Sequence, residues 1–420
     1  MNRRSLAARA ALSMLALSVV ACAADNDADR PSMALTATSP PTGSDAAMPF
    51  VAADGERFYL SWTENTGEEG ATGRSIHAVR MAWIDHGGEW STPVTLASSD
   101  RFFVNWADFP SVASAGEGRL AAHWLLRSGE GTYDYDIMVS TSTDGGARWS
   151  EPRVMHDDGV AAEHGFLSFF PQEEGFGAVW LDGRETVGGH GGGGAMTLRG
   201  GLLTWDGTPR DLALLDPHIC DCCQTGAALT DEGVVAVYRG RTEGEIRDIL
   251  AVRMVNGEWS TPATIHDDGW EIPACPVNGP AVAADGRRVA TAWFTGAGDI
   301  PRVRLAFSSD AGATWEAPLQ VDEGAPLGRV DVVLLDDGSA LVVWLEATDD
   351  DAAVMARRVR PDGSLDAAES LALTRQVRAS GFPRMARSGE RILLSWTEPA
   401  VEQGGAATLR AAWLDVGGAR

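Results

Sequence analysis

The chain has 420 residues and a formal net charge of −25 at pH 7, and all 34 of its basic residues are arginine. The absence of lysine excludes a P-loop lysine and a Schiff-base lysine. So acidic a chain is also a poor candidate for sequence-independent binding to nucleic acid, which depends on neutralising phosphates. The 44% hydrophobic content is typical of a folded domain. Because 48 glycines accompany 15 tryptophans, we expect many turns and many short strands that each bury an aromatic side chain.

The first 21 residues resemble a bacterial lipoprotein signal peptide. Arg3 and Arg4 precede a short apolar stretch, which ends in the run VVAC at Cys22. The resemblance implies that Cys22 carries the lipid and that residues 22–31 form a polar tether. An ordinary signal peptide followed by a buried cysteine is the alternative. Ala23 follows the cysteine, which by the same resemblance favours the outer membrane of a Gram-negative cell.

Seven similar modules fill the rest of the chain. Each contains a β-rich run that ends in an aromatic residue, and successive runs lie 51 to 62 residues apart. Each module reads as four short strands separated by glycine-rich turns, a pattern typical of a β-propeller. The aromatic residues are Trp62, Trp124, Trp180, Tyr238, Trp293, Trp344 and Trp396.

The two ends of the repeat region predict a closed ring. The seventh module stops at Arg420 without a fourth strand, and a spare strand-like segment lies at residues 32–39. A spare strand at one end and a missing one at the other favour closure over an open stack, since closure removes the exposed edges. We therefore predict an all-β, seven-bladed propeller over residues 32–420, with residues 32–39 completing the last blade.

Two turns carry the Asp-box pattern S-x-D-x-G-x-x-W. The pattern falls between the third and fourth expected strands of two modules, and the chain thereby resembles the sialidase or BNR-repeat superfamily over most of its length. The resemblance implies that the boxes are structural, with the aspartate accepting N–H groups of the turn. The box residues are Ser142, Asp144, Gly146 and Trp149, and Ser308, Asp310, Gly312 and Trp315.

Charged residues recur where each second strand is expected to end and where each first strand begins. Such loops line the binding face of a propeller, where arginines can hold an anionic group and carboxylates can act as acid or base. Sialidases combine an arginine triad with a tyrosine nucleophile and acidic partners, so the resemblance implies similar roles here. These charges could instead pair with one another and with loop backbone. The arginine candidates are Arg127, Arg184, Arg239, Arg241, Arg329 and Arg384, and the catalytic candidates are Tyr238, Asp182, Glu346 and Asp108.

Four cysteines besides Cys22 fall in the loops that enter two adjacent modules. Cys220, Cys222 and Cys223 lie in one loop and Cys275 in the next. In an exported protein, disulfides between them are one interpretation. A soft-metal site for Cu(I) or Zn(II), with His218 as a further ligand, is another, and free or redox-active thiols are a third. The sequence predicts no other cofactor.

The sequence therefore predicts a monomeric, lipid-anchored propeller that binds, and could hydrolyse, a glycan or a small acidic ligand at its axial face. If the protein is an enzyme, the resemblance implies an exo-sialidase-like glycoside hydrolase. A metal-binding or redox protein that uses the cysteines is a second hypothesis. A non-catalytic scaffold for protein interactions is a third. Contact with the membrane is expected through the lipid alone, and no nucleic-acid partner is expected.

Overall fold

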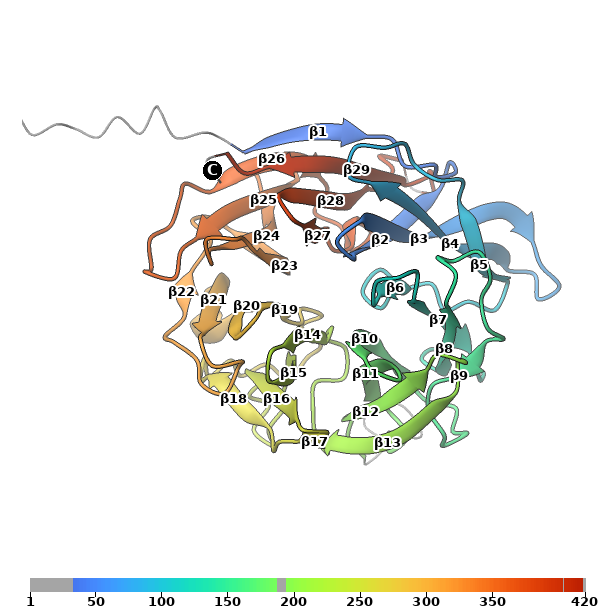
Figure 1. The fold of residues 1–420 in the computed structure, drawn as a ribbon, viewed down its shortest axis with the longest axis horizontal. Helices are drawn as coiled ribbons and strands as arrows, with labels where there is room; N and C mark the ends of the chain where they lie inside the picture. Colours follow the sequence, from blue (N-terminus) through green and yellow to red (C-terminus); the bar gives the residue numbers. More distant parts are fainter. Residues whose placement is uncertain (1–32, 187–193, 403, 418–420) are drawn as a thin grey trace, which may run out of the picture.

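A computed structural model describes residues 33–186, 194–402 and 404–417, and in it seven β-sheets form a ring (Figure 1). The expected seven-bladed, all-β propeller is thereby confirmed. The predicted signal peptide, the tether and Cys22 lie outside the described residues. Within the described ranges, no helix is long and apolar enough to cross a membrane.

The blades follow one another in chain order, each with its first strand nearest the centre of the ring (Figure 1). Blade 1 contains β2 (Ala46–Ala53), β3 (Arg57–Glu69), β4 (Ser75–Asp85) and β5 (Val94–Ser99). Blade 2 contains β6 (Ser111–Ser114), β7 (Leu120–Arg127), β8 (Tyr135–Ser142) and β9 (Arg153–Val154). Blade 3 contains β10 (His164–Gln172), β11 (Gly175–Asp182), β12 (Thr197–Thr204) and β13 (Pro209–Asp216).

Blade 4 contains β14 (Gly226–Thr230), β15 (Gly233–Arg239), β16 (Ile249–Val255), β17 (Glu258–Trp259) and β18 (Ala263–His266). Blade 5 contains β19 (Ala281–Asp285), β20 (Arg288–Thr295), β21 (Arg302–Ser308) and β22 (Leu319–Gln320). Blade 6 contains β23 (Pro326–Leu334), β24 (Ala340–Ala347), β25 (Ala352–Val359) and β26 (Glu369–Thr374). Blade 7 contains β27 (Arg384–Ser388), β28 (Arg391–Glu398) and β29 (Thr408–Asp415). Short 3-10 helices, η2 (Ala297–Asp299) and η3 (Arg378–Ser380), lie in two of the connections.

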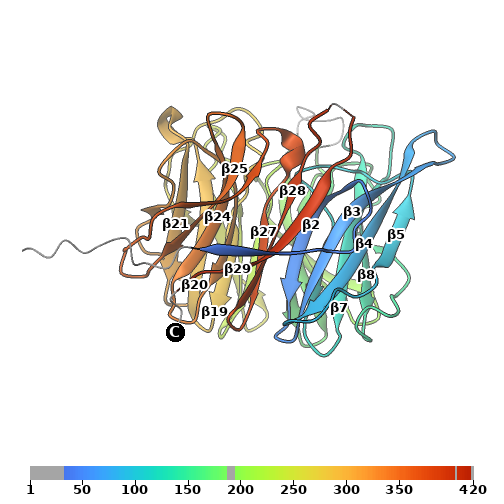
Figure 2. The ribbon, with the colours of Figure 1, turned by 90° about the horizontal axis from the view of Figure 1, so that it is seen from above.

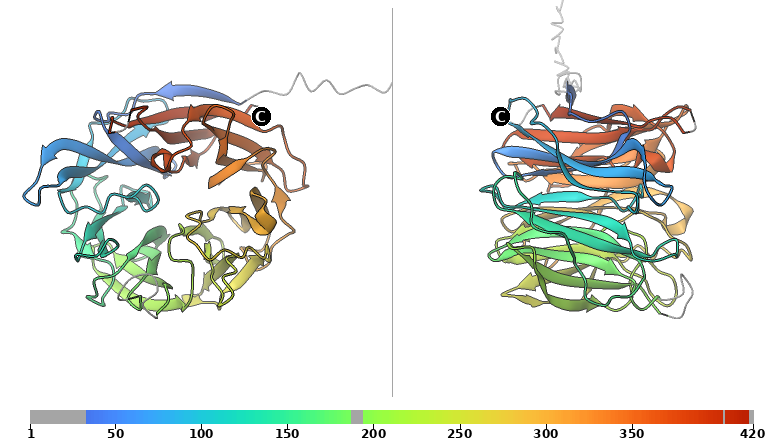
Figure 3. Two further views of the ribbon diagram at one scale, coloured as in Figure 1. Left: turned by 180° about the vertical axis from the view of Figure 1, so that it is seen from behind. Right: turned by 90° about the vertical axis from the view of Figure 1, so that its right-hand side faces the viewer.

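The ring is closed by β1 (Ala34–Thr38), as the spare N-terminal segment predicts. This strand pairs antiparallel with β29, so that Ala34 lies opposite Asp415 and Thr38 opposite Ala411 (Figure 2). Its neighbours also hold it. The Met33 N–H donates to the Glu369 carboxylate of blade 6 at 3.0 Å, and Trp90 Nε1 of blade 1 donates to Thr38 Oγ1 at 2.7 Å. A strand from the N-terminus therefore joins three blades at one seam, which is visible from behind and from the side in Figure 3.

The seven aromatic residues that mark the modules all lie buried in the second strands of their blades. A buried indole N–H usually has an acceptor. In three blades that acceptor is the carboxylate two residues after the tryptophan, which the sequence places at the strand exit. These carboxylates therefore hold the core side chain of their own blade. The three pairs are Trp62 with Glu64 at 3.1 Å, Trp180 with Asp182 at 3.1 Å, and Trp344 with Glu346 at 2.8 Å.

In two blades that lack a carboxylate at the exit position, a different acid accepts the hydrogen bond of the aromatic side chain. Tyr238 donates its hydroxyl to Asp216 Oδ2 at 2.6 Å, and Trp293 Nε1 donates to Asp268 Oδ2 at 2.6 Å. Both acceptors come from the end of the preceding blade. Neighbouring blades are thus joined through the buried polar ends of their aromatic side chains.

The two Asp-box segments form matching turns. In the first, Gly146 N–H donates to Ser142 Oγ at 3.0 Å and Arg148 N–H donates to Asp144 Oδ1 at 2.8 Å. In the second, the Gly312 N–H donates to Ser308 Oγ at 2.9 Å. The glycine of each box has a positive φ, 86° in Gly146 and 79° in Gly312, where a side chain would strain the backbone. Serine and aspartate side chains therefore complete the hydrogen bonding of the turn.

Candidate ligand-binding site

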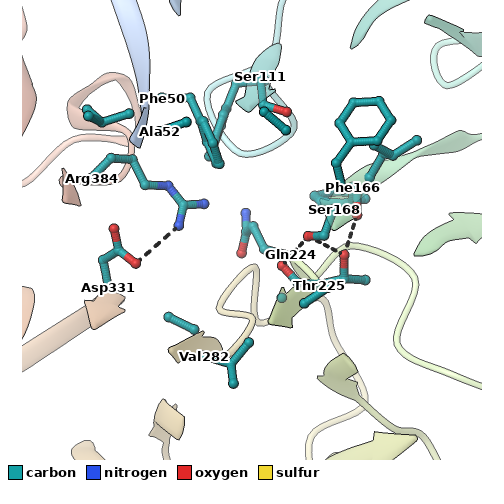
Figure 4. A pocket seen from close by; sticks show the side chains of 18 of the residues that line it. Phe50, Ala52, Ser111, Phe166, Ser168, Gln224, Thr225, Val282, Asp331 and Arg384 are labelled. Carbon is teal, nitrogen blue, oxygen red and sulfur yellow. Dashed lines mark hydrogen bonds and ion pairs between the residues drawn. The ribbon is translucent and has the colours of Figure 1, made fainter. Parts of the chain in front are cut away.

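A cavity of about 390 Å³ lies along the axis of the ring. Residues on the first strands of all seven blades line the cavity, so every blade contributes to its wall. The wall combines aromatic rings with a few polar groups (Figure 4). Ligand pockets of proteins typically have volumes of roughly 300–1,000 Å³ and this kind of mixed lining. The cavity is therefore large enough for a compact small molecule.

Arg384, at the start of β27, is a cationic side chain in this wall. Its guanidinium points into the cavity between Asp331 and Gln224 (Figure 4). The guanidinium carbon lies 5.4 Å from the ring centre of Phe50 and 5.0 Å from that of Phe109. Its Nε is buried without a hydrogen-bond partner among the described residues. Burial lowers the pKa of Arg384, although Asp331 acts in the opposite direction.

The carboxylate nearest to Arg384 is already engaged by the backbone. Asp331 lies 3.7 Å from Arg384 Nη1, which is beyond hydrogen-bonding distance. Its Oδ2 accepts the Met385 N–H at 2.7 Å, and its Oδ1 accepts the Val332 N–H at 3.0 Å. Arg384 therefore keeps donors that an anion in the cavity can accept.

Other polar groups in the wall are occupied by neighbouring segments. Gln224 donates Nε2 to the Ala107 carbonyl at 2.6 Å and accepts the Gly279 N–H at 3.0 Å. Thr225 donates Oγ1 to the Phe166 carbonyl at 2.7 Å. These bonds hold the entry loops of different blades together, so the shape of the cavity is established before any ligand enters.

Asp108 is the second titratable group of interest in the wall. Its Oδ1 accepts the Phe166 N–H at 2.9 Å, and its Oδ2 accepts the hydroxyl of Tyr135 at 2.9 Å. The same hydroxyl lies 3.1 Å from Glu163 Oε1. Gly165 makes room for this group, because a Cβ there would lie 1.8 Å from Asp108 Oδ2. Burial raises the pKa of Asp108 to about 7, so below neutral pH this carboxyl is largely uncharged.

This shifted pKa predicts a pH-dependent contribution to stability. The native carboxyl keeps its proton up to about pH 7, whereas the unfolded group loses it near its ordinary value of 3.8. Below about pH 4 the carboxyl is protonated in both the native and the unfolded state, and the stabilisation from Asp108 is then fully present. It falls by about 1.4 kcal/mol per pH unit as the pH rises toward 7. Because asparagine resembles the uncharged carboxyl, urea denaturation of the wild type and of Asp108→Asn at several pH values should give two curves that lie close together below about pH 4. The curves should separate as the pH rises, with the wild type becoming the less stable protein. Parallel curves would contradict the shifted pKa.

Of the six arginines that the sequence nominates for an anionic ligand, Arg384 is the one that lines the cavity. Arg239 is buried and donates to three backbone carbonyls, those of Asn278, Arg247 and Phe294. Arg329 lies over the ring of Trp106 and donates to the carbonyls of Val377 and Gly381, which flank η3. The remaining three have local partners: Arg127 donates to the Thr132 carbonyl, Arg184 pairs with Asp157, Asp158 and Asp182, and Arg241 pairs with Asp221 and Glu245.

The four nominated catalytic residues are not brought together. Asp108 lines the cavity, whereas Tyr238, Asp182 and Glu346 lie on three other blades and are absent from its wall. Asp182 is fully buried, and Tyr238 is 1% exposed. Burial raises the pKa of Tyr238 far above its usual value, and its hydroxyl donates to Asp216. The side chains of these three residues therefore have structural partners in the blades.

The nominated cysteines do gather in space, but without the nominated histidine. The Sγ atoms of Cys220, Cys222 and Cys223 lie within 4.8 Å of one another. Among the described residues, His218 is not part of this group of ligand atoms. The backbone N–H of His218 donates to the Asp216 carboxylate. The candidate metal ligands are thus sulfur atoms alone.

A second cluster, which the sequence does not reveal, contains two histidines. The rings of His156 and His164 stack with centres 3.7 Å apart. Asp158 Oδ2 lies 3.1 Å from His156 Nδ1 and 3.2 Å from His164 Nε2. Arg184 Nη2 lies 3.0 Å from the same carboxylate, which therefore has three nitrogen partners. His156 lies in the connection between β9 and β10, and His164 is the first residue of β10. No local motif marks the two histidines in the sequence.

No protein-family model matches the chain, and no curated protein matches it in sequence. Solved structures resemble it at low identity. A protein of unknown function from Dyadobacter fermentans is 14% identical with a TM-score of 0.48, over 92% of this chain and 98% of the other. The NanB sialidase from Streptococcus pneumoniae is 12% identical with a TM-score of 0.44, over 91% and 70%. The propeller domain of the Trilobed protease from Pyrococcus furiosus is 11% identical with a TM-score of 0.46, over 88% and 95%. The propeller fold of this chain rests on its own strand topology.

Proposed function

We propose that the protein binds a small acidic carbohydrate, or another carboxylate of similar size, in the axial cavity. The observation that supports this proposal is the guanidinium of Arg384, which lines the cavity and whose ion pair with Asp331, at 3.7 Å, is too long for a hydrogen bond. A largely buried donor that lacks an acceptor is costly. An anionic ligand would supply charge-assisted hydrogen bonds in surroundings of low polarity, where such bonds are strong.

The rest of the wall suits a sugar acid. Phe50, Phe109 and Phe166 offer apolar surface, while Ser111 and Ser168 place hydroxyl groups on the lining. Asp108 is largely uncharged below about pH 7, because burial raises its pKa to that value. Repulsion between Asp108 and an anionic ligand is therefore weak below neutral pH and grows above it.

Binding is better supported than hydrolysis. A tyrosine nucleophile needs activation by a lowered pKa or by an adjacent base. Tyr135 has two carboxyl neighbours, but it is fully buried and does not line the cavity. Burial and its acidic neighbours raise the pKa of Tyr135 well above its usual value. We therefore assign ligand recognition to the cavity and no bond cleavage.

Calorimetric titration with N-acetylneuraminate and with its neutral methyl ester tests the proposal. We expect the acid to bind, and the ester and the Arg384→Gln variant each to bind roughly ten- to a hundred-fold more weakly. This is the effect of losing about 1.5–3 kcal/mol of charged hydrogen bonding. Arg410→Gln, at an exposed arginine of β29, is the matched control and should bind as the wild type does.

Equal affinity for the acid and the ester, or unchanged binding by Arg384→Gln, would contradict an anion site at Arg384. Failure to bind N-acetylneuraminate, glucuronate or galacturonate would remove the acidic-sugar assignment and favour the scaffold hypothesis. A fluorogenic sialoside added to the same preparation tests for hydrolysis, and we expect no release of the fluorophore.

A further inference from the structure

Four thiols from two adjacent blades lie together at the edge of the ring interior. Cys220, Cys222 and Cys223 belong to the loop between β13 and β14, and Cys275 to the loop between β18 and β19. The Sγ atoms of Cys220 and Cys223 are 2.7 Å apart, and the Cys222 thiol hydrogen-bonds with both and with Cys275. Three of the four are buried, and Cys275 is exposed. The cluster therefore has a closed interior and one member at the surface.

The loop that carries three of these thiols is held by backbone bonds on both sides. The Ile219 N–H donates to the Met196 carbonyl at 2.9 Å, and the Cys220 N–H donates to the Arg239 carbonyl at 3.0 Å. Gln224, directly after Cys223, bonds to two other entry loops. These backbone bonds fix the conformation of the loop and thereby position its sulfur atoms.

Cationic side chains stabilise negative charge on this cluster. Arg247 Nη1 lies 3.4 Å from Cys220 Sγ, and the Arg247 side chain is 3% exposed. A thiolate is the form of cysteine that ligates metals. The buried guanidinium of Arg247 therefore places a positive charge beside the cluster, where it can stabilise a negatively charged sulfur.

The composition of the cluster selects among metals. Its close group contains sulfur only, without a histidine or a carboxylate. Thiolate ligands favour soft ions such as Cu(I), whereas structural zinc sites are almost always tetrahedral with four ligands. Three sulfur atoms lie within 4.8 Å of one another, and that close group does not include Cys275. Three thiolates complete the coordination of Cu(I) but leave Zn(II) one ligand short.

We propose that Cys220, Cys222 and Cys223 form a three-thiolate site for Cu(I), with Cys275 as the exposed thiol through which the ion enters. On binding, each coordinating thiol releases its proton to water, and neither the copper nor the sulfur changes oxidation state. The site lies in loops other than the strands that carry Arg384 and Asp331, so it does not depend on the proposed sugar-acid site.

Competition for Cu(I) with bathocuproine disulfonate tests the site on the full, reduced protein under anaerobic conditions. We expect the wild type to remove one equivalent of Cu(I) from the chelator and Cys222→Ser to bind it at least a hundred-fold more weakly. Arg384→Gln is the matched control and should bind Cu(I) as the wild type does. Circular dichroism of each variant shows whether it is folded.

Alkylation of the wild type provides a measurement that needs no variant. Five thiols should react in the reduced, metal-free, unlipidated chain after unfolding. In the native protein, one equivalent of Cu(I) should slow the reaction of Cys220, Cys222 and Cys223 relative to the metal-free protein, whereas Cys275 should react equally fast with and without the ion. Preferential binding of Zn(II) would overturn the Cu(I) assignment. Two disulfides in protein purified without reductant, together with no Cu(I) uptake after reduction, would overturn the metal site altogether.

Discussion

Replacing Asp182 with alanine is expected to lower the free energy of unfolding by about 3–5 kcal/mol, the usual cost of removing one partner from a buried ionic group. Asp182 is fully buried and accepts hydrogen bonds from Trp180 Nε1 at 3.1 Å and from Arg184 Nε at 2.7 Å. His164 Nε2 lies 3.7 Å away. The substitution leaves an indole N–H and part of a guanidinium without their acceptor. Urea denaturation with tryptophan fluorescence measures the loss.

Glu398 offers a control at the equivalent position of blade 7. It follows Trp396 by two residues, but Trp396 Nε1 has no hydrogen-bond partner among the described residues, and Glu398 pairs with the exposed Arg410. Exposed ion pairs contribute roughly 0–1 kcal/mol, so Glu398→Ala should destabilise the protein by no more than that. Equal losses from the two substitutions would show that the indole acceptors do not matter for stability.

Deleting residues 1–40 is expected to lower the free energy of unfolding by about 3–5 kcal/mol. The deletion removes β1 and its five register pairs with β29, together with the acceptor of Trp90. A net value of roughly 1 kcal/mol for each lost hydrogen bond gives this range. The exposed edge of β29 should also promote association. Thermal unfolding and size-exclusion chromatography measure the two effects.

Deleting residues 1–31 is the matched control, because that chain keeps β1. It should unfold at the temperature of the full chain and elute at the same volume. If the two deletions behave alike, the N-terminal strand does not hold the ring closed.

The fold could be predicted because its signals are local and repeated. Each blade places an aromatic residue at the same point of its second strand, and the turns between strands carry glycine at positions of positive φ such as Gly146 and Gly312. The predicted closing strand, residues 32–39, corresponds to β1 at Ala34–Thr38. Blade 4 differs in detail, because the turn at Asn256 and Gly257 adds the two-residue strand β17.

The site could be predicted only in part, because the environment of each charge depends on distant residues. The sequence nominates six arginines without distinguishing among them. In the folded ring the Arg384 guanidinium lines the cavity, whereas the Arg239 guanidinium donates to three backbone carbonyls. Asp182 and Glu346 look like exposed loop acids in the sequence, yet both accept hydrogen bonds from the indole of their own blade. The stacked His156 and His164 lie in the connection before β10 and at the first residue of that strand, and no spacing rule links them.

We expect the seam at β1 to form late in folding. Met33 contacts Glu369, 336 residues further along the chain. Contacts of such long range carry a large loop-closure entropy and form slowly. Because β1 can pair only after β29 has been made, we expect the edge of β29 to stay open to other chains until the ring closes.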